Sequence, residues 1–123
     1  MISVDEETTI EELKKLVAKF RDERNWKKYH NPKDLAVSIS IEAAELLEKF
    51  QWKSNEETEE MLKNKEKLEK ISEELADIID YCLSFSDVTG IDISGVVKKK
   101  IEENKKKYPI EKVNGNYKKY TEL

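Results

Sequence analysis

The segment from residue 32 to about residue 50 constrains the fold most, because as a helix it would be apolar on two sides. On a helical wheel at about 100° per residue, one side collects Leu35, Ala36, Ile39, Ala43, Leu46, Leu47 and Phe50. Much of the opposite side is formed by Val37, Ile41 and Ala44. A helix that is apolar on two sides is buried on both, inside a bundle or at a subunit interface. The narrow strip between the sides, with Ser38, Glu42, Glu45 and Lys49, is therefore not expected to be an ordinary solvated face.

Helix start signals recur along the chain, and breaks are few, with three Gly and two Pro in 123 residues. Thr9 and Glu12 form a capping box that begins a first helix running toward Trp26. Asn31 followed by Pro32 is a second start signal, for the helix that should reach about Phe50.

The second half of the chain also contains helix start and stop signals. Ser54 opens a short, highly charged helical segment, and a long third helix with apolar residues at core spacing should end at Gly90. A fourth helix begins at Asp92 or Ser94 and stops before Pro109, which leaves a polar tail over about 110–123. With no convincing strand pattern, the chain 1–123 is predicted to be a single all-α domain, a bundle of four to five helices.

Four carboxylates form the strongest candidate site, because they occupy two apolar helices as Glu42-x-x-Glu45 and Glu74-x-x-Asp77. Residues three apart share a helix face, so two such helices side by side would gather all four acids. Burying that much negative charge is prohibitive unless a cation neutralises it. Oxygen ligands without thiolates indicate Mg²⁺ or Mn²⁺. A ferritin-like di-iron site is disfavoured, because such sites use Glu-x-x-His pairs and the one histidine, His30, lies outside both motifs.

Composition and charge exclude several classes of partner and compartment. The net charge of −4 gives no reason to expect nucleic-acid binding through a broad basic surface. No apolar stretch approaches the roughly 20 residues that span a bilayer, and the first residues do not resemble a signal peptide. Cys82 is the single cysteine, so no intramolecular disulfide can form. We therefore expect a cytoplasmic protein that does not associate with membranes.

Two further groups of side chains suggest what the metal would carry. Trp26, His30 and Trp52 bracket the helix that bears Glu42 and Glu45, and flat aromatic faces suit stacking on a base. Taken alone, a tryptophan at a helix end is more often part of the core. A second group on the last helix could contact phosphate oxygens, although such runs are usually solvated: Lys100, Asn104 and Lys107.

These residues together give the chain a resemblance to the MazG-like all-α nucleoside triphosphate pyrophosphatases, and within them to the dCTP pyrophosphatase branch. The matching stretches, in order, are Phe20–Trp26, His30–Pro32, Glu42–Glu45, Phe50–Lys53, Glu73–Asp77 with Tyr81, Asn104–Pro109 and Lys119–Leu123.

The resemblance implies a Mg²⁺-dependent enzyme that cleaves dCTP or related (d)NTPs between the α- and β-phosphates to a monophosphate and pyrophosphate. It implies that Glu42, Glu45, Glu74 and Asp77 are metal ligands, and that Glu45 or Glu42 also orients the attacking water. Residues that would hold the substrate are Trp26, His30, Trp52, Tyr81, Lys100, Asn104 and Lys107. It also implies a bundle completed by dimerisation, as a homodimer or homotetramer, in agreement with the two-sided apolar helix.

Two positions depart from the family pattern, and alternatives remain. Many MazG relatives have Glu directly before the first motif glutamate, where this chain has Ile41. The base-pocket positions of the first helix, including Val17, are not diagnostic, so base preference stays open between dCTP, dUTP, phosphoribosyl-ATP and broad NTP use. The competing hypothesis is a helical regulator that binds nucleotide or metal as an oligomer without turnover.

Overall fold

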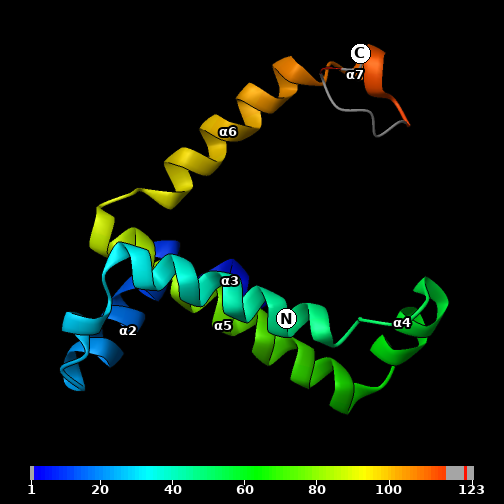
Figure 1. Ribbon diagram of the computed structural model, residues 1–123. Helices are drawn as coiled ribbons and strands as arrows, with labels where there is room; N and C mark the ends of the chain where they lie inside the picture. Colours follow the sequence, from blue (N-terminus) through cyan, green and yellow to red (C-terminus); the bar gives the residue numbers. More distant parts are fainter. Residues whose placement is uncertain (1, 116–120, 122–123) are drawn as a thin grey trace. The chain divides into compact units, whose positions relative to one another are not determined.

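The computed structural model describes residues 2–115 and residue 121, and every regular element in those residues is a helix (Figure 1). Contacts divide the chain into two compact units, Met1–Gly90 and Ile91–Leu123. The prediction of an all-α fold is confirmed. Among the described residues, no helix is long and apolar enough to cross a membrane.

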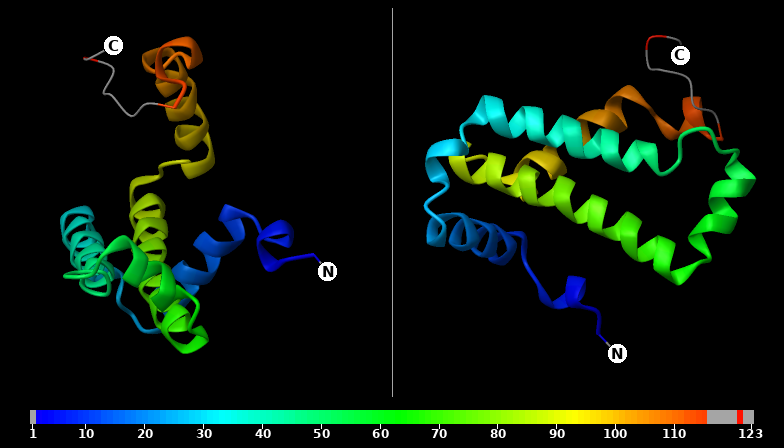
Figure 2. Two further views of the ribbon diagram at one scale, coloured as in Figure 1. Left: turned by 90° about the vertical axis from the view of Figure 1, so that its right-hand side faces the viewer. Right: turned by 60° about the horizontal axis from the view of Figure 1, so that its bottom comes forward.

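The first unit is organised around one long central helix, α5, which packs against α3, α2 and α4. Figure 2 shows α3 and α5 lying side by side, with α4 in the connection between them. In chain order the elements are α1 (Val4–Glu7), α2 (Ile10–Glu23), the 3₁₀ helix η1 (Lys27–Tyr29), α3 (Pro32–Glu48), α4 (Asn55–Leu62) and α5 (Lys65–Thr89).

Side-chain caps fix the predicted helix starts. The Thr9 hydroxyl accepts a hydrogen bond from the Glu12 backbone N–H at 3.1 Å, and Ser54 does the same for α4, accepting from Glu57 at 3.1 Å. These caps satisfy backbone donors that the first helical turn leaves without partners. The start at Asn31-Pro32 is confirmed too, since Asn31 caps α3.

The end of α5 is set by Gly90, whose φ of 74° is the left-handed conformation that glycine adopts without a Cβ penalty.

The structure packs part of the first apolar side predicted for α3, since Ile39, Leu46 and Phe50 are half-buried. Leu35 is fully packed, but Ala36, Ala43 and Leu47, which the wheel assigned to the same side, are exposed. The buried side is rotated toward the acidic strip, so that Glu42 and Glu45 are partly buried against α5. The wheel identifies which positions are apolar, but it does not say which of them a neighbouring helix covers.

The second unit contains α6 (Ile93–Lys107) and the short α7 (Ile110–Val113). The predicted fourth helix is therefore confirmed, including its end before Pro109, whereas α7 begins inside the segment predicted to be a polar tail. Of the predicted motif 119–123, only Thr121 lies within the described residues.

Candidate active site

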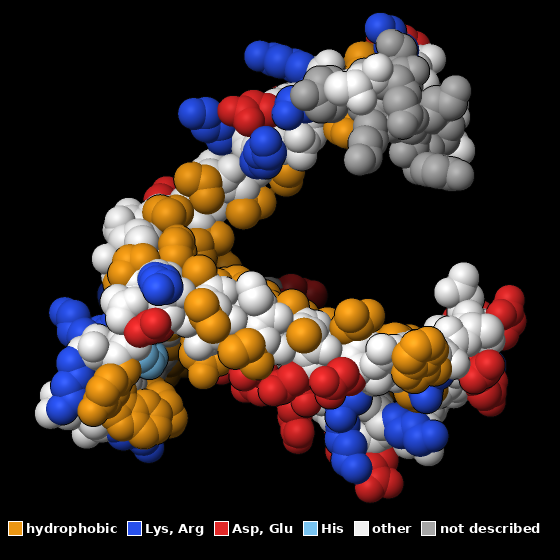
Figure 3. Space-filling model, viewed as in Figure 1, with side chains coloured by type: hydrophobic (Ala, Val, Ile, Leu, Met, Phe, Trp, Pro, Cys, Tyr) orange, Lys and Arg blue, Asp and Glu red, His pale blue; other side chains and the backbone are white. Residues whose placement is uncertain are grey.

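Three carboxylates meet where α3 packs against α5. Glu42 and Glu45 come from one face of α3 and Glu74 from the facing side of α5, and each offers an oxygen within 4.8 Å of the others. All three residues are partly buried. On the face drawn in Figure 3, acidic side chains gather beside hydrophobic ones over this helix pair. The i,i+3 spacing aligns the two α3 acids, and the packing of α5 supplies the third.

The electrostatics of this acidic trio are those of a site that needs a cation. Hydrogen bonding with Glu42, followed by the charge of Glu42, raises the pKa of Glu45. Burial, followed by the charge of Glu45, raises the pKa of Glu74. The charge of Lys49 offsets part of this rise at Glu74. One oxygen each of Glu42 and Glu74 is buried without any hydrogen-bond donor. Because buried polar atoms are normally satisfied, the two unpaired oxygens fit a site that accepts a further positive group.

The donor set fits a hard divalent cation. Carboxylate oxygens are the ligands that Mg²⁺ and Mn²⁺ prefer, and an octahedral Mg²⁺ bound through a few carboxylates keeps its other positions for water or phosphate oxygens. The acidic trio can therefore hold such an ion and leave room for a phosphorylated ligand.

Asp77, the fourth acid of the predicted motif, lies one turn beyond Glu74 on α5 and outside the trio. It is close enough for its charge to raise the pKa of Glu74 further. Its side chain instead lines a neighbouring cavity. The ligand role of Asp77 remains a prediction, while its position connects the acidic trio to that cavity.

The cavity beside Asp77, which we call the aromatic pocket, has a volume of about 410 Å³. It lies between α2, the η1 segment and α5, and it brings together three of the predicted substrate residues, Trp26, His30 and Tyr81. A pocket with apolar walls and a few polar groups is typical of small-molecule sites. The full lining is Leu16, Val17, Phe20, Arg21, Trp26, His30, Asp77, Asp80, Tyr81 and Ser84.

Aromatic rings shape the outer wall of the pocket. Phe20 and Trp26 meet edge to face, with ring centroids 5.8 Å apart and planes at 73°. The Arg24 guanidinium lies 3.8 Å from the Phe20 ring centroid, which holds that ring in place. Trp26 remains 43% exposed and so is accessible to a ligand that stacks on it.

His30 contributes a neutral polar group to the wall of the aromatic pocket. Burial, helped by the charge of Arg21, lowers the pKa of His30. Its Nδ1 atom is buried and has no hydrogen-bond partner. A neutral imidazole can either donate or accept there, so a ligand could satisfy it.

Three polar residues of the pocket were not predicted as site residues from the sequence, namely Arg21, Asp80 and Ser84. Arg21 is only 4% exposed and is held by Asp22 and Asp87, with N···O distances of 2.9 Å to each. The helical spacing could have predicted that Arg21 is buried, because it falls four residues after Val17 on the apolar stripe of the first helix.

Four predicted substrate residues lie outside the aromatic pocket. Trp52 is 92% exposed and has a φ of 67°, a left-handed conformation that is unusual for a bulky residue. Lys100, Asn104 and Lys107 are exposed on α6, in the second unit. The predicted roles of these four residues stay predictions.

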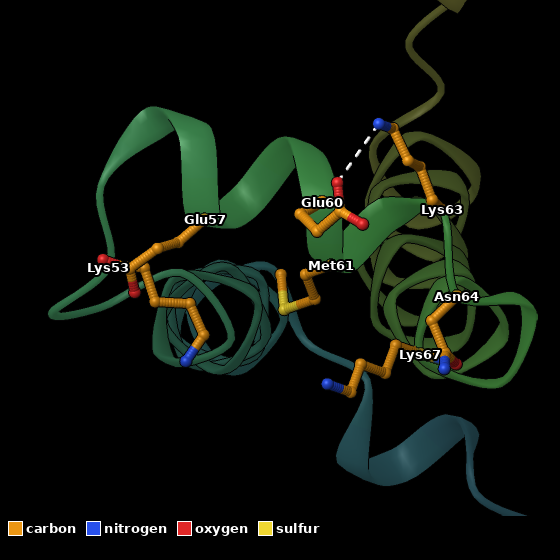
Figure 4. A pocket seen from close by; sticks show the side chains of 7 residues that line it. All are labelled: Lys53, Glu57, Glu60, Met61, Lys63, Asn64 and Lys67. Atoms are coloured by element: carbon orange, nitrogen blue, oxygen red, sulfur yellow. Dashed lines mark hydrogen bonds and ion pairs between the residues drawn. The ribbon is translucent and has the colours of Figure 1, made fainter.

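A larger cavity of about 570 Å³ lies at the turns that join α3, α4 and α5 (Figure 4). Its lysines are accompanied by glutamates, and Lys63 is paired with Glu60 at 3.1 Å. The lining contains no aromatic ring, and we assign it no role: Lys53, Glu57, Glu60, Met61, Lys63, Asn64 and Lys67.

The sequence profile of the MazG-like family matches residues 37–123, a range that includes all three acids of the trio. The chain belongs to the MazG-like family. The resemblance inferred from the sequence is therefore confirmed at the level of the family.

Named relatives cover nearly the whole chain. The dCTP pyrophosphatase 1 of Bos taurus is 33% identical, over 98% of this chain and 72% of that protein. The human dCTP pyrophosphatase 1 is 31% identical over 98% of this chain and 71% of that protein. The crystal structure of a pyrophosphatase from Archaeoglobus fulgidus is 50% identical and superposes with a TM-score of 0.76, over 81% of this chain and 92% of that one.

Proposed function

We propose that this protein is a nucleoside triphosphate pyrophosphohydrolase that cleaves dCTP or a related nucleotide between the α- and β-phosphates. The products would be a nucleoside monophosphate and pyrophosphate. The observation that carries the proposal is an acidic trio, with two buried carboxylate oxygens that accept no hydrogen bond, beside an aromatic pocket. The names of the relatives, which are pyrophosphatases and dCTP pyrophosphatases, support the same reaction.

In this proposal the acidic trio binds the phosphates through a cation, and the aromatic pocket binds the base and sugar. Glu42, Glu45 and Glu74, joined by Asp77, would hold a divalent cation, Mg²⁺ or Mn²⁺. When bound, such an ion neutralises charge on the phosphates. Glu45 or Glu42 would also orient the attacking water.

The aromatic pocket would hold the base and sugar. Trp26 offers a stacking surface, while Tyr81 and the unsatisfied Nδ1 of His30 offer polar contacts. On α6, Lys100, Asn104 and Lys107 would approach the phosphates, and Trp52 would complete the base site.

We also propose that the protein works as a homodimer or as a homotetramer built from dimers. The side of α3 that faces away from α5 carries Val37, Ile41 and Leu47, which are 49%, 52% and 63% exposed. Ala36, Ala43 and Ala44 share this surface and would allow a second helix to approach closely. Charged residues on this side are confined to the helix ends, at Lys33 and Glu48. A largely apolar surface of this kind suits the self-complementary contact of a two-fold dimer.

A substrate panel tests the proposed reaction. Purified protein is incubated with Mg²⁺ and with dCTP, dUTP, dTTP, dATP and the ribonucleotides in turn, and the products are separated by ion exchange. We expect monophosphate and pyrophosphate in equal amounts. Release of orthophosphate and a nucleoside diphosphate, without pyrophosphate, would exclude the proposed mechanism.

A charge-neutral variant separates the enzyme from the non-catalytic alternative. Glu45→Gln removes one acid of the trio and should lower kcat by about a hundredfold or more, in the range of general-base loss. Glu73→Gln is the matched control, because Glu73 is exposed on α5 and outside the trio. Full activity in Glu45→Gln would remove Glu45 from the catalytic site, whereas a wild type that turns over none of the triphosphates would support the regulator.

A further inference from the structure

Asp80 is a pocket residue for which the proposed chemistry has no role. It lies on α5 one turn after Asp77, beside Tyr81, and lines the aromatic pocket. It also lines an adjoining cavity of about 350 Å³ on the α2 side. Among the described residues Asp80 makes no hydrogen bond or ion pair, so its oxygens are available to a ligand.

Of the other charged groups of the pocket, Arg21 is paired and Asp77 is grouped with the proposed metal ligands. Arg21 is held by two carboxylates, with distances of 2.9 Å to Asp22 and to Asp87. Asp77 lies next to the acidic trio and interacts electrostatically with Glu74. Asp80 is therefore the pocket carboxylate that the proposed metal site does not use, and it has no donor on a wall otherwise formed largely by apolar and aromatic side chains.

The surroundings of Asp80 favour a hydrogen-bond donor. Burial, followed by the charge of Asp77, raises the pKa of Asp80. A neutral N–H donor relieves both effects, because it solvates the carboxylate without adding negative charge. An approaching carbonyl oxygen does the opposite, since it brings a second acceptor against the first.

We propose that Asp80 selects the base, by accepting a hydrogen bond from the exocyclic amino group of a cytosine-type ring stacked in the aromatic pocket. Carboxylates are established acceptors for the cytosine amino group. Uracil and thymine present a carbonyl oxygen at the same ring position and leave the carboxylate unsatisfied. The inference rests on the proposed function, and it assigns the preference for dCTP over dUTP to one side chain.

The isosteric variant Asp80→Asn tests this assignment. An amide can accept from an amino group or donate to a carbonyl, so the variant should tolerate both rings. We expect the ratio of kcat/KM for dCTP to that for dUTP to fall by about tenfold or more. Activity on dUTP should be kept or increased. Glu69→Gln, which also removes one exposed carboxylate from α5 but lies outside the pocket, should leave the ratio unchanged.

Other outcomes overturn the assignment. An unchanged ratio in Asp80→Asn would show that Asp80 does not contact the base. An equal loss of kcat/KM on both substrates would instead indicate that Asp80 binds the metal or supports the fold. Circular dichroism of the variant, together with a second variant, Asp80→Ser, identifies any loss that comes from misfolding.

A binding measurement separates this inference from the proposed function. Calorimetric titration with dCMP and dUMP requires no hydrolysis, and the wild type should bind dCMP more tightly, whereas Asp80→Asn should not discriminate. A wild type that hydrolyses none of the triphosphates but still prefers dCMP would refute the proposed function and keep the role of Asp80. A wild type that hydrolyses dCTP without preferring dCMP or dCTP would refute the role of Asp80 alone.

Discussion

At the scale of single residues, repulsion and burial within the acidic trio should destabilise the folded protein by an amount that can be measured without substrate. The pKa values of Glu45 and Glu74 are raised in the folded chain, the first mainly by Glu42 and the second mainly by burial. The folded state therefore binds protons more tightly than the unfolded state, so stability falls as the pH rises from the ordinary glutamate range through the raised pKa values. Below that range both states are protonated and the penalty disappears.

We therefore expect the urea midpoint of the metal-free protein in EDTA to fall as the pH is raised from 4 toward neutrality, in the manner of about one or two ionising groups. Millimolar Mg²⁺ or Mn²⁺ should restore the midpoint at neutral pH, because a cation stabilises the ionised cluster. In Glu45→Gln the pH dependence should be shallower and the response to metal weaker, whereas Glu69→Gln should behave like the wild type. A wild-type midpoint that does not respond to either metal would contradict the assignment of the trio as a metal site.

At the scale of helices, stability should depend on the few apolar side chains that α5 buries. Within the described residues the fully buried hydrophobic positions are Leu35 and Leu83. Leu83 is 3% exposed, whereas Leu68 on the same helix is 45% exposed. Leu83→Ala should lower the free energy of unfolding by about 2–5 kcal/mol, and Leu68→Ala by less than half as much. Chemical denaturation of both variants, with unchanged helical circular dichroism before the transition, is the measurement. Equal losses would show that Leu68 is buried in the assembled protein.

The helices also show how far the sequence alone can predict the fold and the site. Helix starts could be predicted, because a cap such as Thr9 or Ser54 acts on a backbone N–H only three residues away. The pairing of Glu42 and Glu45 on one face follows from spacing in the same way. The burial of α3 could not be predicted, because the partner helix decides which apolar positions it covers. For the same reason the pocket role of Asp80, which depends on how α2 and α5 pack, was missed although the residue is three positions from Asp77.

At the scale of the whole molecule, a single chain leaves too much apolar surface for a complete fold. The outward side of α3, with Val37, Ile41 and Leu47, remains about half or more exposed. Val37 and Ile41 belong to the second apolar side of the sequence pattern, and Leu47 belongs to the edge of the first side. A helix surface whose middle is apolar can pair with itself across a two-fold axis without burying a charge at the centre of the contact. A second copy of this chain is therefore the partner that we propose for this surface.

Disrupting this surface should separate the subunits. Ile41→Glu places a carboxylate in the middle of the proposed contact, where its desolvation is uncompensated, and should weaken dimerisation by about a hundredfold or more. Light scattering coupled to size-exclusion chromatography should give a dimer or larger for the wild type and a monomer for the variant at micromolar concentration. Val4→Glu is the control, because Val4 is 77% exposed on α1 and outside this surface. A monomeric wild type, or an unchanged mass for Ile41→Glu, would contradict the proposed contact.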